Sequence, residues 1–330
     1  MKKILQGLFQ QEYLSRSKAK QILIEIAQEK FNAAHVASFL TVFQMRPIST
    51  EELQGFRDAL LELCLKIDLS DYDSVDLCGT GGDGKDTFNI STLAAVVVAG
   101  AGYNVTKHGN YGVSSVCGSS NVLEKLGYKF TNKEDDLKRQ LDRHKLCFLH
   151  APLFHPAMKA VGAIRRDLGV RTFFNLLGPL VNPVQPKQQM VGVSNLEIVR
   201  LYQYVLQQTD KEFAIVHALD GYDEVSLTGA FKIITPKSEA LLTAQEIGQN
   251  KQNAKDLSGG STIEAAAKIF SNILEGKGST AQNQVVCTNA GIAIQRFNPQ
   301  KALEACIREA EEALLNQKAV QNFKGLLEKQ

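Results

Sequence analysis

The chain has 330 residues, of which 44% are hydrophobic and 22% charged, an ordinary globular composition that is long enough for two lobes and argues against long disorder. Its formal net charge of +2 is too small to indicate nucleic acid, and no run of about eighteen apolar residues occurs, so we expect neither nucleic acid nor a membrane as a partner. Six cysteines lie far apart without a C-x-x-C pair, which argues against a zinc knuckle or a disulfide framework and favours reduced thiols in the cytoplasm.

Residues 1–70 predict a small helical domain. In LQGFRDALLEL (53–63) the apolar side chains recur at intervals of three and four, and glycine and proline are nearly absent from the whole stretch. Ser49 or Thr50, followed by two glutamates, is typical of a helix N-cap with acids in the first turn. These features indicate a bundle of amphipathic helices.

Residues 71–330 predict a larger α/β domain with a central, mostly parallel sheet. Glycine-rich turns separate short β-branched runs from alanine-rich helices, in the order SVDLC, STLAAVVVAGAG, NVTK and NVLEKLG, which is the sequence form of βαβ units. The segment 152–190 holds five of the eight prolines and predicts helices and loops inserted between sheet elements. Further strands are predicted at 211–221 (KEFAIVHALDG) and 283–291 (NQVVCTNAG), and further helices at Ile263–Leu274 and 301–314.

The stretch DLCGTGGDGKDTFNIST (76–92) contains most of a P-loop, G-x-x-x-x-G-K. Asp86 occupies the position of the required Ser or Thr, and the next helix N-cap is expected only at Ser91 or Thr92, so a nucleoside triphosphate loop is disfavoured. Glycine N–H groups and hydroxyl donors at a helix N-terminus still suit an anion. The alternative is that the glycines only form tight turns.

A second polar loop follows the next predicted strand, in KHGNYGVSSVCGSSNVLEKLG (107–127). It also ends at a helix, where Asn121 and Glu124 are spaced as cap and N3 acid. Loops after consecutive parallel strands meet at one edge of an open α/β sheet, where such folds bind ligands. The two loops together therefore favour a shared anion site.

Two further groups have the chemistry to complete such a site. Asp223 and Glu224 follow the strand FAIVH, and carboxylates beside a polyphosphate can hold Mg²⁺, although adjacent acids in a loop are more often surface residues. The segment 151–180 offers His155 and three arginines, a residue type suited to gripping a planar carboxylate, although each arginine could equally be exposed or salt-bridged.

These motifs, taken together, resemble the anthranilate phosphoribosyltransferase family. GTGGD (79–83), NIST (89–92), KHGN (107–110), HPAMK, RTFFNLLGPLVNP and the pair DE (223–224) occur in the family's order over nearly the whole chain. The resemblance implies a homodimer of the nucleoside phosphorylase and phosphoribosyltransferase type, with the helical domain joined by part of 165–190. It also implies transfer of the phosphoribosyl group of phosphoribosyl pyrophosphate to the amine of anthranilate, releasing pyrophosphate, in tryptophan biosynthesis.

The resemblance also implies roles for individual residues. Phosphoribosyl pyrophosphate would be bound by Gly79, Gly82, Asp83, Thr87, Asn89, Ser91, Thr92, Lys107, Ser115 and Ser119. Anthranilate would be bound by Gly79, His108, Asn110, His155, Arg165 and Gly178. Magnesium would be held by Ser91, Asp223 and Glu224. The residues implied in catalysis are Asp83, Lys107, Asp223 and Glu224.

The chain departs from the commonest family pattern in the second loop. Tyr111 and Gly112 replace Arg-Ala, Val116 and Cys117 replace Lys-Ser or similar, and Ser120 and Asn121 replace Ala-Asp. The lost arginine removes a cation from a loop expected to cover phosphate.

Three other functions are compatible with parts of the sequence. A pyrimidine nucleoside phosphorylase would share the loops but usually carries a further C-terminal domain. A nucleic-acid-binding relative would need a basic cleft and a broken DE pair. A P-loop nucleoside triphosphatase would use Asp220, after a strand, as its Walker B acid.

Overall fold

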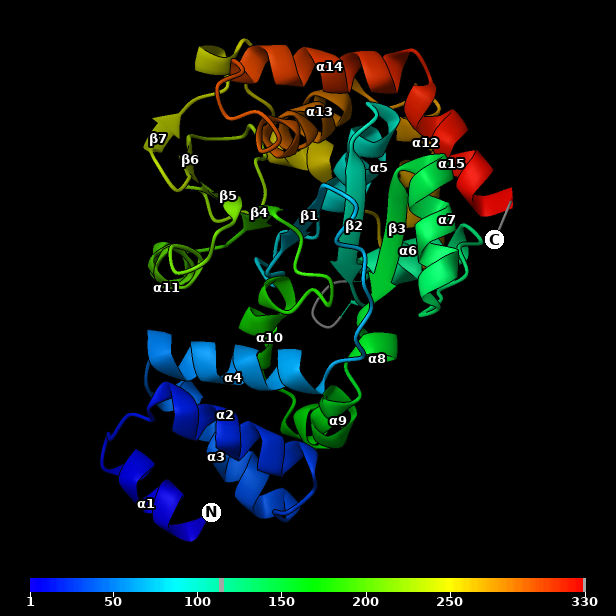
Figure 1. Cartoon of the computed structure of the whole chain (residues 1–330). Helices are drawn as coiled ribbons and strands as arrows, with labels where there is room; N and C mark the ends of the chain where they lie inside the picture. Colours follow the sequence, from blue (N-terminus) through cyan, green and yellow to red (C-terminus); the bar gives the residue numbers. More distant parts are fainter. Residues whose placement is uncertain (113–115, 329–330) are drawn as a thin grey trace. The chain divides into compact units, whose positions relative to one another are not determined.

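The computed structural model of the chain describes residues 1–112 and 116–328. Two compact units divide the chain: a helical unit of Met1–Ile67 and Ala151–Gln185, and an α/β unit of Asp68–His150 and Pro186–Gln330 (Figure 1). No helix in the described part is long and apolar enough to cross a membrane.

The helical unit consists of short helices, as predicted. Its first segment contains α1 (Lys2–Phe9), α2 (Arg16–Ala27), α3 (Ala33–Met45) and α4 (Thr50–Leu63), and its second contains α8 (Ala151–Phe154), α9 (Ala157–Leu168), α10 (Phe174–Leu177) and a 3₁₀ turn at Gly178–Leu180. The start of α4 is capped as expected, since Ser49 Oγ accepts from Glu52 N at 3.1 Å and the Glu52 carboxylate accepts from Ser49 N at 2.9 Å.

The second segment of the helical unit begins at Ala151, earlier than the expected 165–190. Helix α9 packs against α2 and α3, and Phe154 O accepts from Leu65 N at 2.8 Å. Phe173 stacks on Phe56 of α4 with ring centroids 4.3 Å apart. Burial of these apolar groups joins the whole inserted segment to the bundle.

A buried ion pair connects two turns of the helical unit. Arg46 Nη2 lies 2.6 Å from Glu52 Oε1, and the two side chains are only 3% and 0% exposed. Glu52 also accepts from Leu14 N at 3.0 Å, so its carboxylate holds three chain segments together. Such a carboxylate cannot lose its charge without leaving the guanidinium uncompensated.

Glu52→Gln is therefore expected to destabilise the protein by about 3–5 kcal/mol, the usual cost of breaking a buried ion pair from one side. Urea unfolding followed by circular dichroism would measure the change. Glu51→Gln is the matched control, because Glu51 is exposed in the same helical turn. Equal stability of the two variants would contradict the structural role of the Arg46–Glu52 pair.

The α/β unit is built on one seven-stranded sheet in the order β3-β2-β1-β4-β5-β6-β7. The strands are β1 (Ser74–Gly79), β2 (Asn104–Gly109), β3 (Leu146–His150), β4 (Gln188–Gly192), β5 (Glu212–Ala218), β6 (Phe231–Ile234) and β7 (Glu239–Leu242). All neighbours from β3 to β5 are parallel, and β6 and β7 are antiparallel, which confirms the predicted mostly parallel sheet. The strand order reverses between β1 and β4, which is where open sheets bind ligands.

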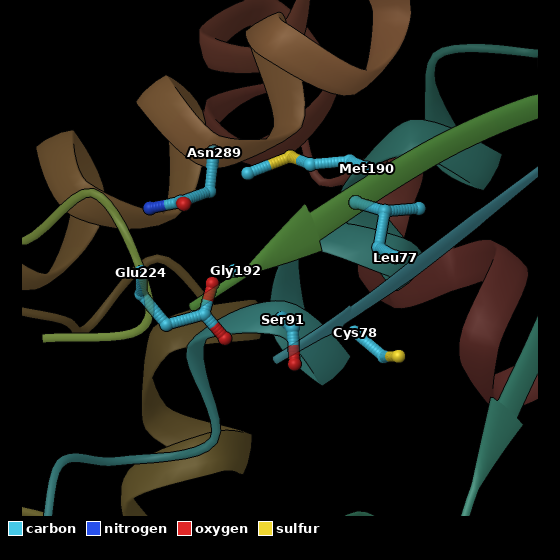
Figure 2. A pocket seen from close by; sticks show the side chains of 7 residues that line it. All are labelled: Leu77, Cys78, Ser91, Met190, Gly192, Glu224 and Asn289. Carbon is cyan, nitrogen blue, oxygen red and sulfur yellow. The ribbon is translucent and has the colours of Figure 1, made fainter. Parts of the chain in front are cut away.

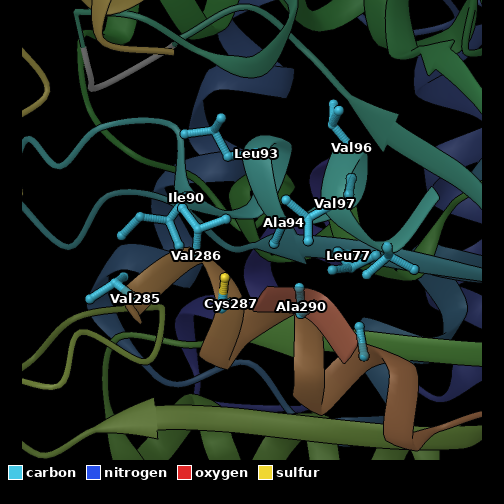
Figure 3. Packing of buried hydrophobic residues seen from close by; sticks show 14 of the residues in the cluster. Leu77, Ile90, Leu93, Ala94, Val96, Val97, Val285, Val286, Cys287 and Ala290 are labelled. Atoms are coloured by element: carbon cyan, nitrogen blue, oxygen red, sulfur yellow. The ribbon is translucent and has the colours of Figure 1, made fainter. Parts of the chain in front are cut away.

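The helices of the α/β unit are α5 (Ile90–Gly100), α6 (Ser119–Lys125), α7 (Glu134–His144), α11 (Leu196–Leu206), α12 (Ile263–Leu274), α13 (Thr280–Gln295), α14 (Leu303–Leu315) and α15 (Lys318–Glu328), with 3₁₀ turns at Gln245–Ile247 and Ala254–Leu257. Helices α5 and α13 pack against each other over the central strands. Figure 3 shows their facing apolar side chains, including Ile90 and Val97 of α5 and Val286 of α13. This core fixes the N-terminus of α5 at the end of β1.

The sequence prediction was wrong at 283–291, which is the middle of α13 rather than a strand. The run is buried nearly throughout, between α5 and α14, so its apolar residues show no amphipathic period. The missed signal is the helix start, where Ser279 Oγ accepts from Gln282 N and Gln282 Oε1 accepts from Ser279 N. Strand β4 was also missed, inside the segment expected to form helices and loops.

Candidate active site

The ends of β1 and β4 meet a loop that carries two carboxylates. We call 79–88 the glycine loop and 219–228 the carboxylate loop. A Cβ on Gly79 would clash with the Asp223 carboxylate, and one on Gly192 would clash with the Asp223 backbone carbonyl. Gly81 N donates to Asp223 Oδ2 at 2.6 Å. Glycine at both strand ends therefore lets the carboxylate loop lie directly against the switch point of the sheet.

The glycine loop has a backbone that few other sequences could adopt. Gly81, Gly82 and Gly84 have φ of 71°, 76° and 71°, and Asp86 has φ of 47°. Asp83 Oδ1 accepts from Lys85 N at 3.0 Å, and Asp223 N donates weakly to Asp83 Oδ2 at 3.5 Å. The loop does not run straight into a helix at Lys85, as a P-loop would, and this geometry disfavours the nucleoside triphosphatase alternative.

The far end of the glycine loop is held by a segment that sequence reasoning did not single out. Thr87 forms an antiparallel bridge with Ser258, and Gly259 N donates to Asp86 O at 2.8 Å. A Cβ on Gly259 would clash with the Thr87 carbonyl. No local sequence pattern predicts the pairing of Thr87 with Ser258, because the two segments are far apart in the sequence.

Helix α5 begins two or three residues earlier than expected, and Asn89 is its N-cap rather than Ser91 or Thr92. Asn89 Nδ2 donates to Cys117 O at 2.9 Å, which ties the start of α5 to the second loop. Ser91, in the first turn, lines a small pocket together with Glu224, and its hydroxyl and backbone N–H favour the charged form of that carboxyl by lowering its pKa. Thr92 is buried and lines an internal apolar cavity with Phe148 instead.

Asp223 and Glu224 are only 7% and 8% exposed. Burial raises the pKa of Glu224 to about 7, although the Lys107 ammonium and the hydrogen bonds from Ser91 lower it. Burial also raises the pKa of Asp223 well above its usual range, and the charges of Glu224 and Asp83 add to that effect. A bound cation would relieve this concentration of negative charge.

This donor set fits magnesium. Two carboxylates and the Ser91 hydroxyl are hard oxygen donors, and Mg²⁺ is commonly held by one or two carboxylates together with substrate phosphate. No group of three or more His, Cys, Asp or Glu side chains in the described residues could form an all-protein metal site. The arrangement is thus suited to a metal that arrives with a phosphorylated substrate.

Lys107 brings a positive charge into the interior beside these carboxylates. It lies on β2, is 2% exposed, and its ammonium donates to Leu77 O on the neighbouring strand. Its positive charge acts on Glu224, as the effect on the carboxyl pKa shows. A lysine is rarely buried without such partners, so its position is a specific feature of this site.

Residues 109–112 and 116–118 of the second loop lie beside the start of α6. Asn110 O accepts from Ser120 N at 3.1 Å and from Ser119 Oγ at 3.3 Å. His108 N donates to Asp76 Oδ1 at 3.1 Å. Ser115 lies outside the described residues.

Asn121 closes the second loop, but it is not the N-cap of α6. The N-cap is Gly118, and Asn121 occupies N3, where its Oδ1 accepts from Gly112 N at 2.8 Å and from Gly118 N at 3.0 Å. The expected capping role for Asn121 with Glu124 was therefore wrong. The departure from the usual aspartate still supplies an acceptor for the loop.

An aromatic cluster lies under the second loop. His150 stacks on Phe130 with ring centroids 4.3 Å apart, and Tyr111 meets His150 edge-on at 4.9 Å. Ser120 Oγ lies 2.8 Å from His150 Nδ1. Tyr111, which replaces the usual arginine, therefore anchors the loop by packing rather than by charge.

Burial lowers the pKa of His150 to about 4. Between about pH 6.5 and about pH 4, the unfolded chain takes up a proton at His150 and the folded chain does not. The free energy of unfolding therefore falls as the pH is lowered through this range. We expect the urea midpoint to drop more between about pH 7.5 and about pH 5 in the wild type than in His150→Gln. Identical drops in the two proteins would contradict a neutral, buried His150.

The other residues implied in anthranilate binding belong to the helical unit. Arg165 lies over the Phe174 ring at 5.1 Å, and its Nη2 approaches Asn175 Oδ1 at 3.4 Å. His155 is buried, and its Nε2 lies 2.8 Å from Val181 O. Gly178 begins the 3₁₀ turn after α10. Arg165 is the preorganised cation of this group, whereas His155 is engaged within the unit.

A small pocket lies beside Glu224 and Ser91, and its lining brings in a residue that sequence reasoning missed (Figure 2). Asn289 of α13 lines it together with Gly192 and Met190. The sequence predicted a strand at 283–291, and it therefore gave no expected role to the Asn289 side-chain amide.

Both units match family models. The description "Glycosyl transferase family, helical bundle domain" fits residues 2–64, and "Glycosyl transferase family, a/b domain" fits residues 71–320. An anthranilate phosphoribosyltransferase of Christiangramia forsetii is 54% identical over 326 residues, covering 99% of this chain and 98% of the relative. The chain belongs to the anthranilate phosphoribosyltransferase family.

Other members of the anthranilate phosphoribosyltransferase family agree with this finding. One from Bacteroides fragilis is 53% identical over 99% of both chains. The crystal structure of the Thermus thermophilus anthranilate phosphoribosyltransferase is 29% identical, with a TM-score of 0.91 over 98% of both chains. The Saccharomyces cerevisiae enzyme, in complex with phosphoribosyl pyrophosphate and Mg, is 25% identical, with a TM-score of 0.86 over 96% of this chain and 93% of that chain.

Proposed function

We propose that this member of the anthranilate phosphoribosyltransferases transfers the phosphoribosyl group of phosphoribosyl pyrophosphate to the amine of anthranilate, releasing pyrophosphate, as a step of tryptophan biosynthesis. The single observation that carries the proposal is the buried Asp223–Glu224 pair held against the glycine loop at the switch point of the sheet. The family membership of the whole chain supports the same reaction.

The phosphoribosyl pyrophosphate site is proposed at the glycine loop and the N-terminus of α5. Backbone N–H groups, the Asn89 amide and the Ser91 hydroxyl lie where a helix N-terminus favours an anion. Magnesium is proposed at Ser91, Asp223 and Glu224, a choice supported by the yeast relative that was solved with phosphoribosyl pyrophosphate and Mg. The bound metal would neutralise charge on the pyrophosphate as it leaves.

The chain's own residues then have two tasks. Loss of pyrophosphate leaves positive charge on the ribose, so the protein must stabilise the leaving anion and hold the incoming amine in line. Lys107 and the glycine-loop N–H groups serve the anion. The amine of anthranilate is weakly basic and carries a lone pair at neutral pH, so the reaction does not demand a general base.

Each unit supplies its own candidates for anthranilate binding. In the α/β unit these are Gly79, His108 and Asn110, which lie at strand ends. In the helical unit Arg165 supplies a cation suited to the anthranilate carboxylate, and His155 and Gly178 are the other candidates of that unit.

We also propose that the protein is a homodimer in the cytoplasm. Phe9, Tyr13 and Met45 of the helical unit are exposed apolar side chains that a second subunit would cover. The described cysteines are all free thiols, which suits a reducing compartment.

The direct test mixes purified protein with Mg²⁺, phosphoribosyl pyrophosphate and anthranilate, and follows the loss of anthranilate fluorescence together with pyrophosphate release. We expect both signals only when all three components are present. Failure of folded protein to consume anthranilate, with phosphorolysis of a nucleoside in its place, would overturn the proposal in favour of a nucleoside phosphorylase.

A further inference from the structure

Helix α13 contains a fully buried asparagine side chain, Asn289, among apolar residues. Asn289 is 0% exposed in the middle of a helix whose neighbouring residues are nearly all apolar and buried. Asparagine is a poor helix former, and burying an amide is unfavourable unless its hydrogen bonds are made. A residue with both disadvantages is best explained by what its side chain contacts.

The Asn289 amide binds the backbone of Val225 at two points. Its Oδ1 accepts from Val225 N at 3.1 Å, and its Nδ2 donates to Val225 O at 2.9 Å. Nδ2 also donates to Val285 O at 2.8 Å, so donor and acceptor atoms of the amide are both engaged. This two-point contact fixes Val225 as a neighbouring strand would, in a segment that has no regular secondary structure.

Val225 immediately follows Glu224, and its N–H belongs to the peptide bond of Glu224. Fixing this peptide plane therefore restricts the position of the Glu224 Cα, from which the side chain extends. At the other side of the pair, Gly81 N holds the Asp223 carboxylate at 2.6 Å. Figure 2 shows Asn289 and Glu224 lining the same pocket, with Ser91 across from Glu224. The carboxylate pair is thus held between the glycine loop and α13.

We infer that Asn289 is a positioning residue for magnesium: by clamping Val225, it holds the Asp223–Glu224 pair in the arrangement that receives the metal with phosphoribosyl pyrophosphate. The inference rests on the proposed function and adds to it a residue with no implied role. Asn289 itself does not contact substrate or metal. Mutation of a group that orients metal ligands typically weakens metal affinity or activity by about 10- to 100-fold.

Asn289→Leu tests the inference, because leucine has a similar size but cannot bind Val225. Mn²⁺ binding in the presence of phosphoribosyl pyrophosphate is measured by electron paramagnetic resonance, with thermal unfolding alongside. We expect about 10- to 100-fold weaker Mn²⁺ binding and a similarly raised Mg²⁺ requirement for turnover. The KM for anthranilate should stay within about twofold of the wild-type value. General damage to the site would raise this KM as well, so an unchanged value indicates a specific effect on metal binding.

Thr288→Val is the matched control. Thr288 is equally buried on the same helix, and its Oγ1 has no hydrogen-bond partner among the described residues. This variant should bind Mn²⁺ like the wild type. Equal weakening in both variants would show that any change in α13 disturbs the site, and would overturn a specific role for Asn289.

Asn289→Ser provides a second variant in case the leucine does not fold, since serine is small but too short to bind both groups of Val225. Unchanged Mn²⁺ binding in a folded variant would overturn the inference, and so would failure of both variants to fold, which would make Asn289 a core residue only. Failure of the wild type to bind Mn²⁺ and to consume anthranilate would instead overturn the proposed function.

Discussion

Asp223→Asn combined with Glu224→Gln should abolish turnover, lowering kcat/KM at least about a thousandfold, while the protein stays folded. The amides keep the size of the side chains but hold magnesium poorly, because neutral oxygens cannot balance its charge. The fold should tolerate the change. Burial raises the pKa of both carboxyls, so the folded protein already disfavours their charged forms.

Steady-state kinetics with anthranilate and thermal unfolding of the same sample give the measurement. Glu311→Gln combined with Glu312→Gln is the control, because it removes two adjacent carboxylates from α14 of the same unit, away from the glycine loop. The control should retain activity. Wild-type activity in the Asp223 and Glu224 variant would remove the proposed metal site.

Arg165→Ala is expected to raise the KM for anthranilate about 10- to 100-fold, the range for losing hydrogen bonds to a charged group. Arg165 is held in place before any ligand arrives, by the Phe174 ring and the Asn175 amide. Burial lowers the pKa of its guanidinium, so a carboxylate partner would compensate a charge that is poorly solvated. The KM for phosphoribosyl pyrophosphate should change much less.

Initial rates over a grid of both substrate concentrations would separate the two constants. Arg166→Ala is the matched control, because the neighbouring arginine on α9 is exposed to solvent. Its KM for anthranilate should resemble that of the wild type. Equal increases for both substrates in Arg165→Ala would place Arg165 outside the anthranilate site.

Much of the fold could be predicted because many helices and strands have a sequence pattern that matches their burial in the folded chain. The capped start of α4 at Ser49 and the β-branched pair Ile215–Val216 of β5 each carry a signal within a few residues. Helix α13 was missed because a helix buried on most sides has the same continuous apolar pattern as a buried strand, although the capping box at Ser279 was a local signal for its start. Strand β4, QQMVG, is short and follows a proline-rich segment that concealed it.

The candidate site could be predicted in its chemistry but not in its geometry. The glycine loop and the DE pair were singled out as separate motifs, and the family resemblance joined them. The contact between Gly81 and Asp223 spans 142 positions of sequence, so only the folded sheet shows that they touch. Asn289 and Ser258 hold the site through backbone groups, and such contacts depend on tertiary placement rather than on a residue pattern.

Anomalous diffraction from a crystal grown with Mn²⁺ and phosphoribosyl pyrophosphate would test the central claim most directly. The predicted result is a manganese peak bound by Glu224 or Asp223, with the pyrophosphate along the glycine loop at the N-terminus of α5. A pyrophosphate bound elsewhere, or manganese held by other carboxylates while Asp223 and Glu224 remain without metal, would contradict this account of the site.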